Sequence, residues 1–124
     1  MFEIDLLKGK TIIITGGGTG LGKSMAVRFA ELGANLVLTS RRQDVLDETS
    51  AEINEATGAK ILTVAADIRS PEQVTDMVTQ SVSRFKKIDG LLNNAAGNFI
   101  SPTEKLSENA FKTIVDIVLL GSFN

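Results

Sequence analysis

The chain has 124 residues, of which 43% are hydrophobic and 23% are charged, as in ordinary folded domains. It contains no cysteine, histidine or tyrosine, which excludes disulfides, Cys/His zinc sites and Ser-His-Asp catalysis, and we expect no metal site. Its formal net charge of −2 argues against a nucleic-acid partner, because binding a phosphate backbone requires a basic surface.

Short apolar runs alternate along the chain with longer segments of helical periodicity. Continuous apolar, β-branched runs are typical of strands buried on both faces, and apolar residues three to four apart are typical of helices that cover a sheet. Strands joined by helices pair in parallel through right-handed crossovers, so the pattern predicts an α/β fold, a Rossmann-type doubly wound parallel sheet with strand order 3-2-1-4. In chain order, the four predicted βα units are strand 11–15 with helix 21–32, strand 36–39 with helix 43–57, strand 61–65 with helix 71–85, and strand 91–93 with a helix that begins after 107.

Cap residues mark one boundary of each predicted helix. Gly33 and Gly58 stand where a residue in the left-handed conformation closes a helix. Ser70 is expected to cap the third helix, with Gln73 completing a capping box, and Ser107 is expected to cap the fourth.

The last helix and the last strand of this pattern lack neighbours. The helix is apolar on more than one side, and the strand has none of the lysine, proline or bulge signals that usually protect a sheet edge. We therefore expect the sheet to be incomplete, with residues 1–124 forming the first part of one larger domain.

The amino terminus, residues 1–5, has two acids and no arginine, so it matches neither a secretory signal nor a mitochondrial presequence. The apolar runs are far shorter than the roughly 20 residues that span a bilayer. We expect a cytoplasmic protein that does not bind a membrane.

The segment 15–24, which reads TGGGTGLGKS, places glycines between a buried strand and a helix start. A phosphate can approach a backbone without Cβ atoms, and a helix amino terminus offers free N–H groups and a positive dipole end. An anionic ligand is the expected occupant. The predicted contacts in this loop are Gly16, Gly18, Thr19, Gly20, Leu21, Gly22 and Lys23.

Two kinds of phosphate loop fit this segment. Residues 17–24 match G-x-x-x-x-G-K-S, the triphosphate loop in which lysine reaches the phosphates and serine binds Mg²⁺. Gly16, Gly20 and Gly22 match G-x-x-x-G-x-G, which is related to the dinucleotide fingerprint. The glycines alone leave both interpretations open.

The ends of the other strands favour a dinucleotide. Arg41 follows the second strand, where an arginine suits the 2′-phosphate of NADP(H) better than the free hydroxyl of NAD(H). After the third strand, Asp67 is placed to accept from an adenine amino group and Ile68 to pack on its ring. A triphosphate site would leave the arginine unexplained.

The loop after the fourth strand, 93–98, contains small residues and amides. Asn94, Ala95 and Gly97 are predicted to let a ribose or nicotinamide approach the backbone. Since the carboxyl ends of parallel strands share one edge of a sheet, all four groups are expected to meet there.

These residues together resemble the short-chain dehydrogenase/reductase family. Its cofactor loop is similar to 15–22, and its N-N-A-G segment is similar to 93–97 with one alanine inserted. Within the family, segment 93–107 with GGGTGLGK and SRR is most similar to the 2,4-dienoyl-CoA reductases, which use NADPH to reduce conjugated double bonds of unsaturated fatty acyl-CoA in β-oxidation. The resemblance implies NADP(H) as cofactor, a fatty acyl-CoA substrate, and a homo-oligomer when the protein is full length.

The resemblance also implies contacts with the acyl-CoA. Arg69 would pair with CoA phosphates, Phe99 would lie against the dienoyl thioester, and Ser107 would contact the substrate. Beside Phe99, Asn98 is predicted to donate to the thioester oxygen.

Two departures from the family pattern concern catalysis. The family's tyrosine and lysine belong beyond position 124, and the family's helix asparagine falls where this chain has Val118 and Leu120. We expect a cofactor-binding part that is inactive alone and belongs to a 2,4-dienoyl-CoA reductase. The alternatives are another short-chain reductase, acting on a 3-oxoacyl thioester or ketone, and a non-catalytic nucleotide-binding module.

Overall fold

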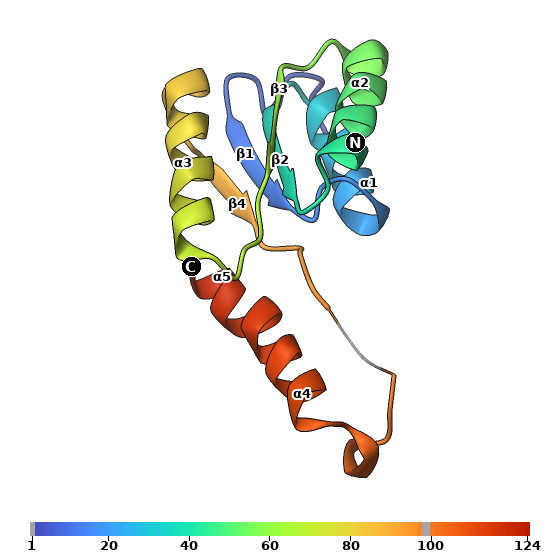
Figure 1. Cartoon of the computed structure of the whole chain (residues 1–124). Helices are drawn as coiled ribbons and strands as arrows, with labels where there is room; N and C mark the ends of the chain where they lie inside the picture. Colours follow the sequence, from blue (N-terminus) through green and yellow to red (C-terminus); the bar gives the residue numbers. More distant parts are fainter. Residues whose placement is uncertain (1, 98–99) are drawn as a thin grey trace.

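The computed structural model describes residues 2–97 and 100–124, and its centre is one parallel sheet (Figure 1). The strand order is β3-β2-β1-β4, which confirms the predicted order 3-2-1-4. Register is fixed by pairs such as Ile12 with Leu36 in β2 and with Gly90 in β4. The strands are β1 (Thr11–Thr15), β2 (Asn35–Ser40), β3 (Ile61–Ala65) and β4 (Gly90–Leu92).

Helices cover both faces of this sheet (Figure 1). One face carries α1 and α2, and the other carries α3, as the doubly wound prediction requires. The short α5 ends the chain beside the start of α3. The helices are α1 (Gly20–Glu31), α2 (Gln43–Thr57), α3 (Pro71–Phe85), the 3₁₀ turn η1 (Thr103–Lys105), α4 (Glu108–Ile114), the π-helical turn η2 (Val115–Leu120) and α5 (Gly121–Phe123).

The hydrophobic core has one layer on each face of the sheet. Consecutive strand residues point to opposite faces, so Ile14 packs with Leu38 and Leu46 under α1 and α2, whereas Ile13 packs with Met77 under α3. All five side chains are buried. This two-sided burial explains why the strands read as continuous apolar runs.

Most of the predicted caps are confirmed. Gly33 and Gly58 have φ of 96° and 72° at the ends of α1 and α2. The Ser107 hydroxyl accepts from the backbone N–H of Ala110 at 3.0 Å. The predicted end of α3 at Phe85 is confirmed, but its cap was not predicted, because the left-handed residue there is Lys86, with φ of 70°.

The capping box at α3 is only half correct. The Ser70 hydroxyl accepts from the backbone N–H of Gln73 at 3.3 Å, as expected. The Gln73 side chain, however, accepts from the backbone N–H of Asp67 at 2.8 Å rather than from Ser70. The glutamine reaches past the cap and orders the loop that follows β3.

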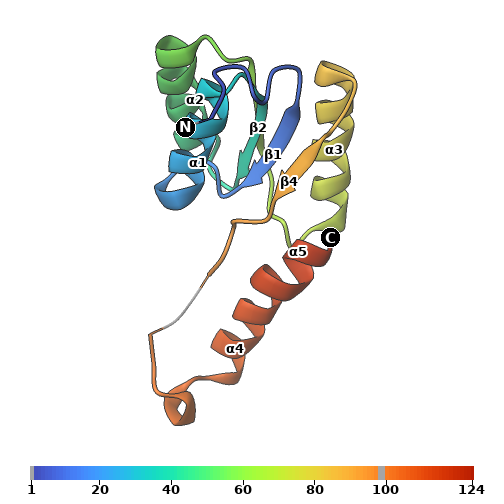
Figure 2. The ribbon, with the colours of Figure 1, turned by 180° about the vertical axis from the view of Figure 1, so that it is seen from behind.

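The C-terminal helix (108–123, comprising α4, η2 and α5) extends away from the sheet and meets it at the α5 end (Figure 2). Several of its apolar side chains are exposed, including Phe111, Leu119 and Phe123, and so is Leu91 in the edge strand. This helix and the edge strand β4 are the two elements that the sequence analysis expected to lack neighbours. In the described part of the chain, no helix is long and apolar enough to cross a membrane.

Candidate dinucleotide site

A cleft of about 540 Å³ opens at the carboxyl ends of all four strands. Each predicted group contributes to the wall of this cleft. The structure thus brings together the glycine loop in segment 15–24, the arginines after β2, the loop after β3 and the loop after β4, which we call the amide loop. The volume lies in the range of about 300–1,000 Å³ that is usual for ligand sites. The lining residues are Gly16, Gly18, Thr19, Thr39, Ser40, Arg41, Arg42, Val45, Ala66, Asp67, Ile68, Arg69, Asn94, Ala95, Ala96 and Ile117.

The glycine loop needs its glycines for close approach as well as for conformation. Gly16 has φ of 69°, and its N–H donates to the carbonyl of Thr39 at 2.8 Å. A Cβ on Gly22 would collide with the carbonyl oxygen of Gly16 and with the Asn94 amide nitrogen. The first turn of α1 is therefore pressed against the loop.

The start of α1 is open toward an anion. Its N-cap Thr19 makes no side-chain cap bond, and the first turn carries no acidic residue. Free N–H groups and the positive end of the helix dipole are thus available to a phosphate.

Thr15 organises the site although sequence reasoning missed it. Its buried hydroxyl accepts from the backbone N–H groups of Asn94 and Ala95, both at 3.0 Å, and donates to the carbonyl of Leu92 at 3.4 Å. The hydroxyl therefore fills its full capacity of one donor and two acceptors. A buried threonine that ends a strand is the only sequence signal for this role.

The amide loop is also held in place by the side chain of one of its own residues, Asn94. Asn94 Nδ2 donates to the carbonyl of Gly16 at 3.2 Å, which ties the loop after β4 to the glycine loop. Ala95 lines the cleft. Gly97 lies outside it, where a Cβ would stand 3.0 Å from Ile117 Cδ1.

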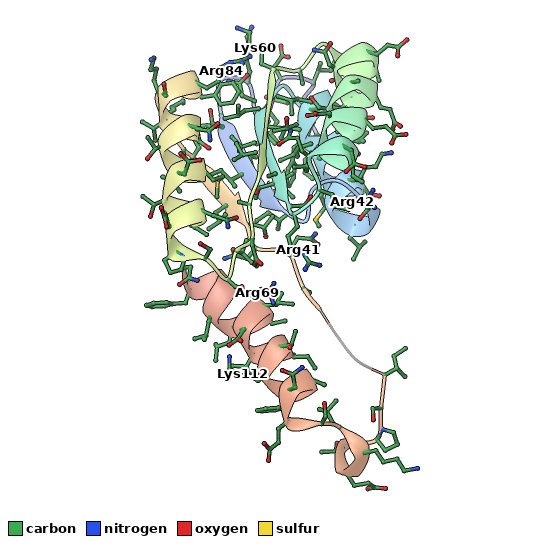
Figure 3. The ribbon with its side chains drawn as sticks, viewed as in Figure 1. Arg41, Arg42, Lys60, Arg69, Arg84 and Lys112 are labelled. Atoms are coloured by element: carbon green, nitrogen blue, oxygen red, sulfur yellow. The ribbon has the colours of Figure 1, made fainter. Side chains whose placement is uncertain are left out.

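The two arginines after β2 differ in their partners. Arg42 Nη2 bonds Asp44 Oδ2 at 2.7 Å, and this bond holds the pKa of the Asp44 carboxyl below its usual range. Arg41 lines the cleft and has no ion-pair partner among residues 2–97 and 100–124. Figure 3 shows Arg41 and Arg69 between the end of the sheet and the C-terminal helix.

Asp67 and Arg69, for which we predicted separate ligands, bond each other. Arg69 Nε lies 3.0 and 3.1 Å from the two carboxylate oxygens, and Nη2 lies 2.6 Å from Oδ2. These bonds, with smaller effects of the Arg69 backbone N–H and of the Arg41 charge, lower the pKa of Asp67, and the side-chain bonds raise the pKa of Arg69. Asp67 is therefore a carboxylate at neutral pH and can accept a hydrogen bond.

Thr39 is one of the residues that line the cleft, and its side-chain hydroxyl is shielded from solvent. The hydroxyl of Thr39, on a residue that is fully buried, has no hydrogen-bond partner in the part of the chain that the structure describes. With the glycine cradle, and with Arg41 and Asp67 on the cleft wall, the residues present fit a dinucleotide.

Some predicted site residues lie elsewhere. Lys23 Nζ bonds Glu52 Oε2 at 2.6 Å and joins α1 to α2 outside the cleft, which gives no support to a triphosphate loop. Ser107 caps α4, and neither Gly20, Gly22 nor the exposed Leu21 lines the cleft. Asn98 and Phe99 lie outside the described residues.

Comparisons with known proteins give matches that include all the residues lining the cleft. The family model of the short chain dehydrogenases matches residues 10–124. A Caenorhabditis elegans protein named "Probable 2,4-dienoyl-CoA reductase 3" is 48% identical over 119 residues, which cover 95% of this chain and 38% of that protein.

Two solved structures share the fold. A short chain dehydrogenase from Bacillus anthracis matches with a TM-score of 0.87 and 47% identity, over 93% of this chain and 47% of that one. L-Sorbose reductase from Gluconobacter frateurii, solved with NADPH and L-sorbose, matches with a TM-score of 0.90 and 29% identity, over 98% of this chain and 46% of that one.

This chain therefore spans less than half the length of these relatives. The family match nevertheless covers both the glycine loop and the loop after β4, the two segments that Thr15 joins. By its sequence, its strand order and the cleft at the ends of its strands, the chain belongs to the short-chain dehydrogenase/reductase family.

Proposed function

We propose that this chain is the NADP(H)-binding part of a reductase that acts on 2,4-dienoyl-CoA. The observation that carries the cofactor half of the proposal is Arg41, a guanidinium without an ion-pair partner in the described chain, on the same cleft as the glycine loop. The acyl-CoA half is supported by the C. elegans relative, which is named as a 2,4-dienoyl-CoA reductase.

The glycine loop and the start of α1 would hold the pyrophosphate. Gly18 and Thr19 line the cleft, and the first turn of α1 offers N–H groups without a competing carboxylate. Bound NADPH would supply a hydride to the conjugated substrate.

Arg41 would read the 2′-phosphate. A hydrogen bond to a charged group contributes about 1.5–3 kcal/mol, which corresponds to a roughly ten- to hundredfold preference for NADP(H) over NAD(H). Arg42 is the weaker candidate because its guanidinium already bonds Asp44. The L-sorbose reductase that was solved with NADPH is a structural relative that binds the phosphorylated cofactor.

Asp67 and Ile68 would bind the adenine. Arg69 keeps Asp67 ionised and fixes the orientation of its carboxylate, so the adenine amino group would share a carboxylate oxygen that already accepts from Arg69. Ile68 supplies an apolar wall. The remaining N–H groups of Arg69, with Asn98, Phe99 and Ser107, are proposed for the acyl-CoA.

Turnover needs a group that this chain does not contain. The enolate that forms on hydride transfer must be protonated or stabilised, and loss of such a group typically costs about 10²–10⁴-fold in rate. In the family this role belongs to a tyrosine, and the sequence has none. We therefore propose that the 124-residue chain alone binds NADPH and does not reduce acyl-CoA.

A titration of the purified chain with NADPH, NADH and Mg-ATP tests the cofactor proposal. Thermal stability and nucleotide fluorescence should both report binding of NADPH that is at least about tenfold tighter than that of NADH. Preference for Mg-ATP, or equal affinity for both dinucleotides, would contradict it. For the complete protein, reduction of a ketone without loss of dienoyl absorbance would favour another short-chain reductase.

A further inference from the structure

The C-terminal helix (108–123) meets the rest of the molecule at one buried residue, Gly121. Within 108–124, all of which the structure describes, every other residue is exposed or partly exposed. Figures 1 and 2 show the same arrangement, with most of the helix extending away from the sheet and its α5 end at the start of α3. The contacts at this end therefore decide how the helix is seated.

Gly121 is seated on Ile68, one of the walls of the cleft. A Cβ at Gly121 would stand 2.7 Å from both Cγ1 and Cδ1 of Ile68, closer than side-chain atoms approach one another. Three residues further on, Asn124 Nδ2 donates to the carbonyl of Ile68 at 3.0 Å. The helix end thus touches both the side chain and the backbone of Ile68.

A third contact lies one turn before Gly121. Ile117 lines the cleft, and its Cδ1 would be 3.0 Å from a Cβ on Gly97. Positions 117, 121 and 124 therefore face the loops after β3 and β4, and the end of the helix packs against these two walls of the cleft. Glycine has a poor intrinsic preference for a helix. The close approach of the helix to Ile68 is therefore the physical reason for a glycine at position 121.

We infer that Gly121 is a positioning residue that sets the place of Ile68, and through it the affinity of the cleft for the adenine end of a dinucleotide. This inference rests on the proposed function, because Ile68 is proposed there as the adenine wall. An added methyl at Gly121 would push Ile68 toward the cleft or lift the helix away from it. Either movement changes the wall while leaving Arg41 and the glycine loop in place.

The test is a double-mutant cycle of Gly121→Ala and Ile68→Ala, with Ser122→Ala as the control at the neighbouring helix position. Gly121→Ala should weaken NADPH binding by about tenfold, the usual scale of overpacking in a well-filled contact. Ile68→Ala should weaken it too, because the apolar wall is lost. The double variant should bind like Ile68→Ala alone, since the removed Cγ1 and Cδ1 leave room for the new methyl. Ser122→Ala should bind as wild type.

Hydrogen exchange of the ligand-free chain gives a readout that needs no nucleotide. Gly121→Ala should speed exchange of the amides of 66–70 and leave those of β1 protected, which separates a local movement from unfolding. Unchanged exchange at 66–70, additive losses in the cycle, or a change of less than twofold in the Kd for NADPH would each overturn the inference. A wild-type chain that binds no dinucleotide would refute the proposed function, and the exchange of 66–70 would still decide whether Gly121 positions Ile68.

Discussion

The hydroxyl of Thr15 accepts a hydrogen bond from the backbone N–H of Asn94 at 3.0 Å, across 79 residues of sequence. The same oxygen accepts from Ala95, so the last residue of β1 fixes the loop that follows β4. The Asn94 side chain then returns to the carbonyl of Gly16. Two walls of the cleft are thereby built as one unit, which the Thr15 hydroxyl and the Asn94 amide hold together.

Replacing Thr15 by valine tests this unit. The valine keeps the shape of threonine and leaves two backbone N–H groups without an acceptor, so the free energy of unfolding should fall by about 1–3 kcal/mol. Urea denaturation measures this loss. Thr15→Ser is the matched control, because it keeps the hydroxyl, and it should retain most of the stability. Equal loss in both variants would show that the methyl group, and not the hydrogen bonds, matters at this position.

The glycine loop predicts a contrast between two neighbouring glycines. Gly22→Ala places a methyl group against the carbonyl oxygen of Gly16, so we expect a loss of about 3 kcal/mol or more in stability together with loss of nucleotide binding. In Gly20→Ala the methyl group would meet no atom of the described residues within 4 Å, so the φ of 54° at this position is the source of strain. This substitution should cost about 1–2 kcal/mol. Thermal denaturation of the two variants checks the order, and a larger loss for Gly20→Ala would contradict the close approach.

The Asp67–Arg69 pair predicts a pH dependence. Arg69→Gln removes the guanidinium bonds, which are the largest cause of the lowered pKa of Asp67, so this pKa should rise toward the ordinary value of an aspartate. In the wild-type chain the pKa of Asp67 is lower in the folded state than in the unfolded state. The pair therefore stabilises the fold at a pH above the unfolded-state pKa, and this contribution is lost as the pH falls through the folded-state pKa. The effect is modest because both side chains are partly exposed.

Carbon NMR of the Asp67 carboxyl group, titrated in the folded chain, measures this shift. Arg28→Gln removes the guanidinium of another exposed pair, with Glu31, and should leave the Asp67 titration unchanged. An Asp67 pKa that stays low in Arg69→Gln would assign the effect to the backbone N–H of residue 69, which donates to Asp67 Oδ1 at 3.0 Å, and to the Arg41 charge.

The fold was largely predictable from the sequence because its determinants are local. The apolar runs set the strands, and Gly33 and Gly58 set the ends of two helices through their own backbone conformation. The gathering of the site residues was also predictable, since parallel strands end at one edge. The exact limits of the strands were less predictable. The fourth strand begins at Gly90 and ends at Leu92, one residue earlier at each end than predicted.

The parts of the site that escaped prediction depend on which side chains meet. Nothing near Lys23 in sequence indicates that its partner is Glu52 on the next helix. Gln73 fits a capping box in its spacing, yet its amide reaches the Asp67 N–H, which a spacing rule does not distinguish. Asp67 and Arg69 each suit a ligand, and only the folded loop shows that they bond each other first.

The proposed reading of the 2′-phosphate is tested by charge reversal at two adjacent positions. Arg41→Asp should weaken NADPH binding by roughly ten- to hundredfold and leave NADH binding little changed, because NADH has no phosphate at that oxygen. Arg42→Asp replaces the same charge one residue later, where the guanidinium is already bonded to Asp44, and should cost less. Fluorescence titration of both variants with both cofactors gives the comparison. If Arg41→Asp weakens NADPH and NADH equally, Arg41 acts on the dinucleotide as a whole and the preference for NADP(H) must come from another residue.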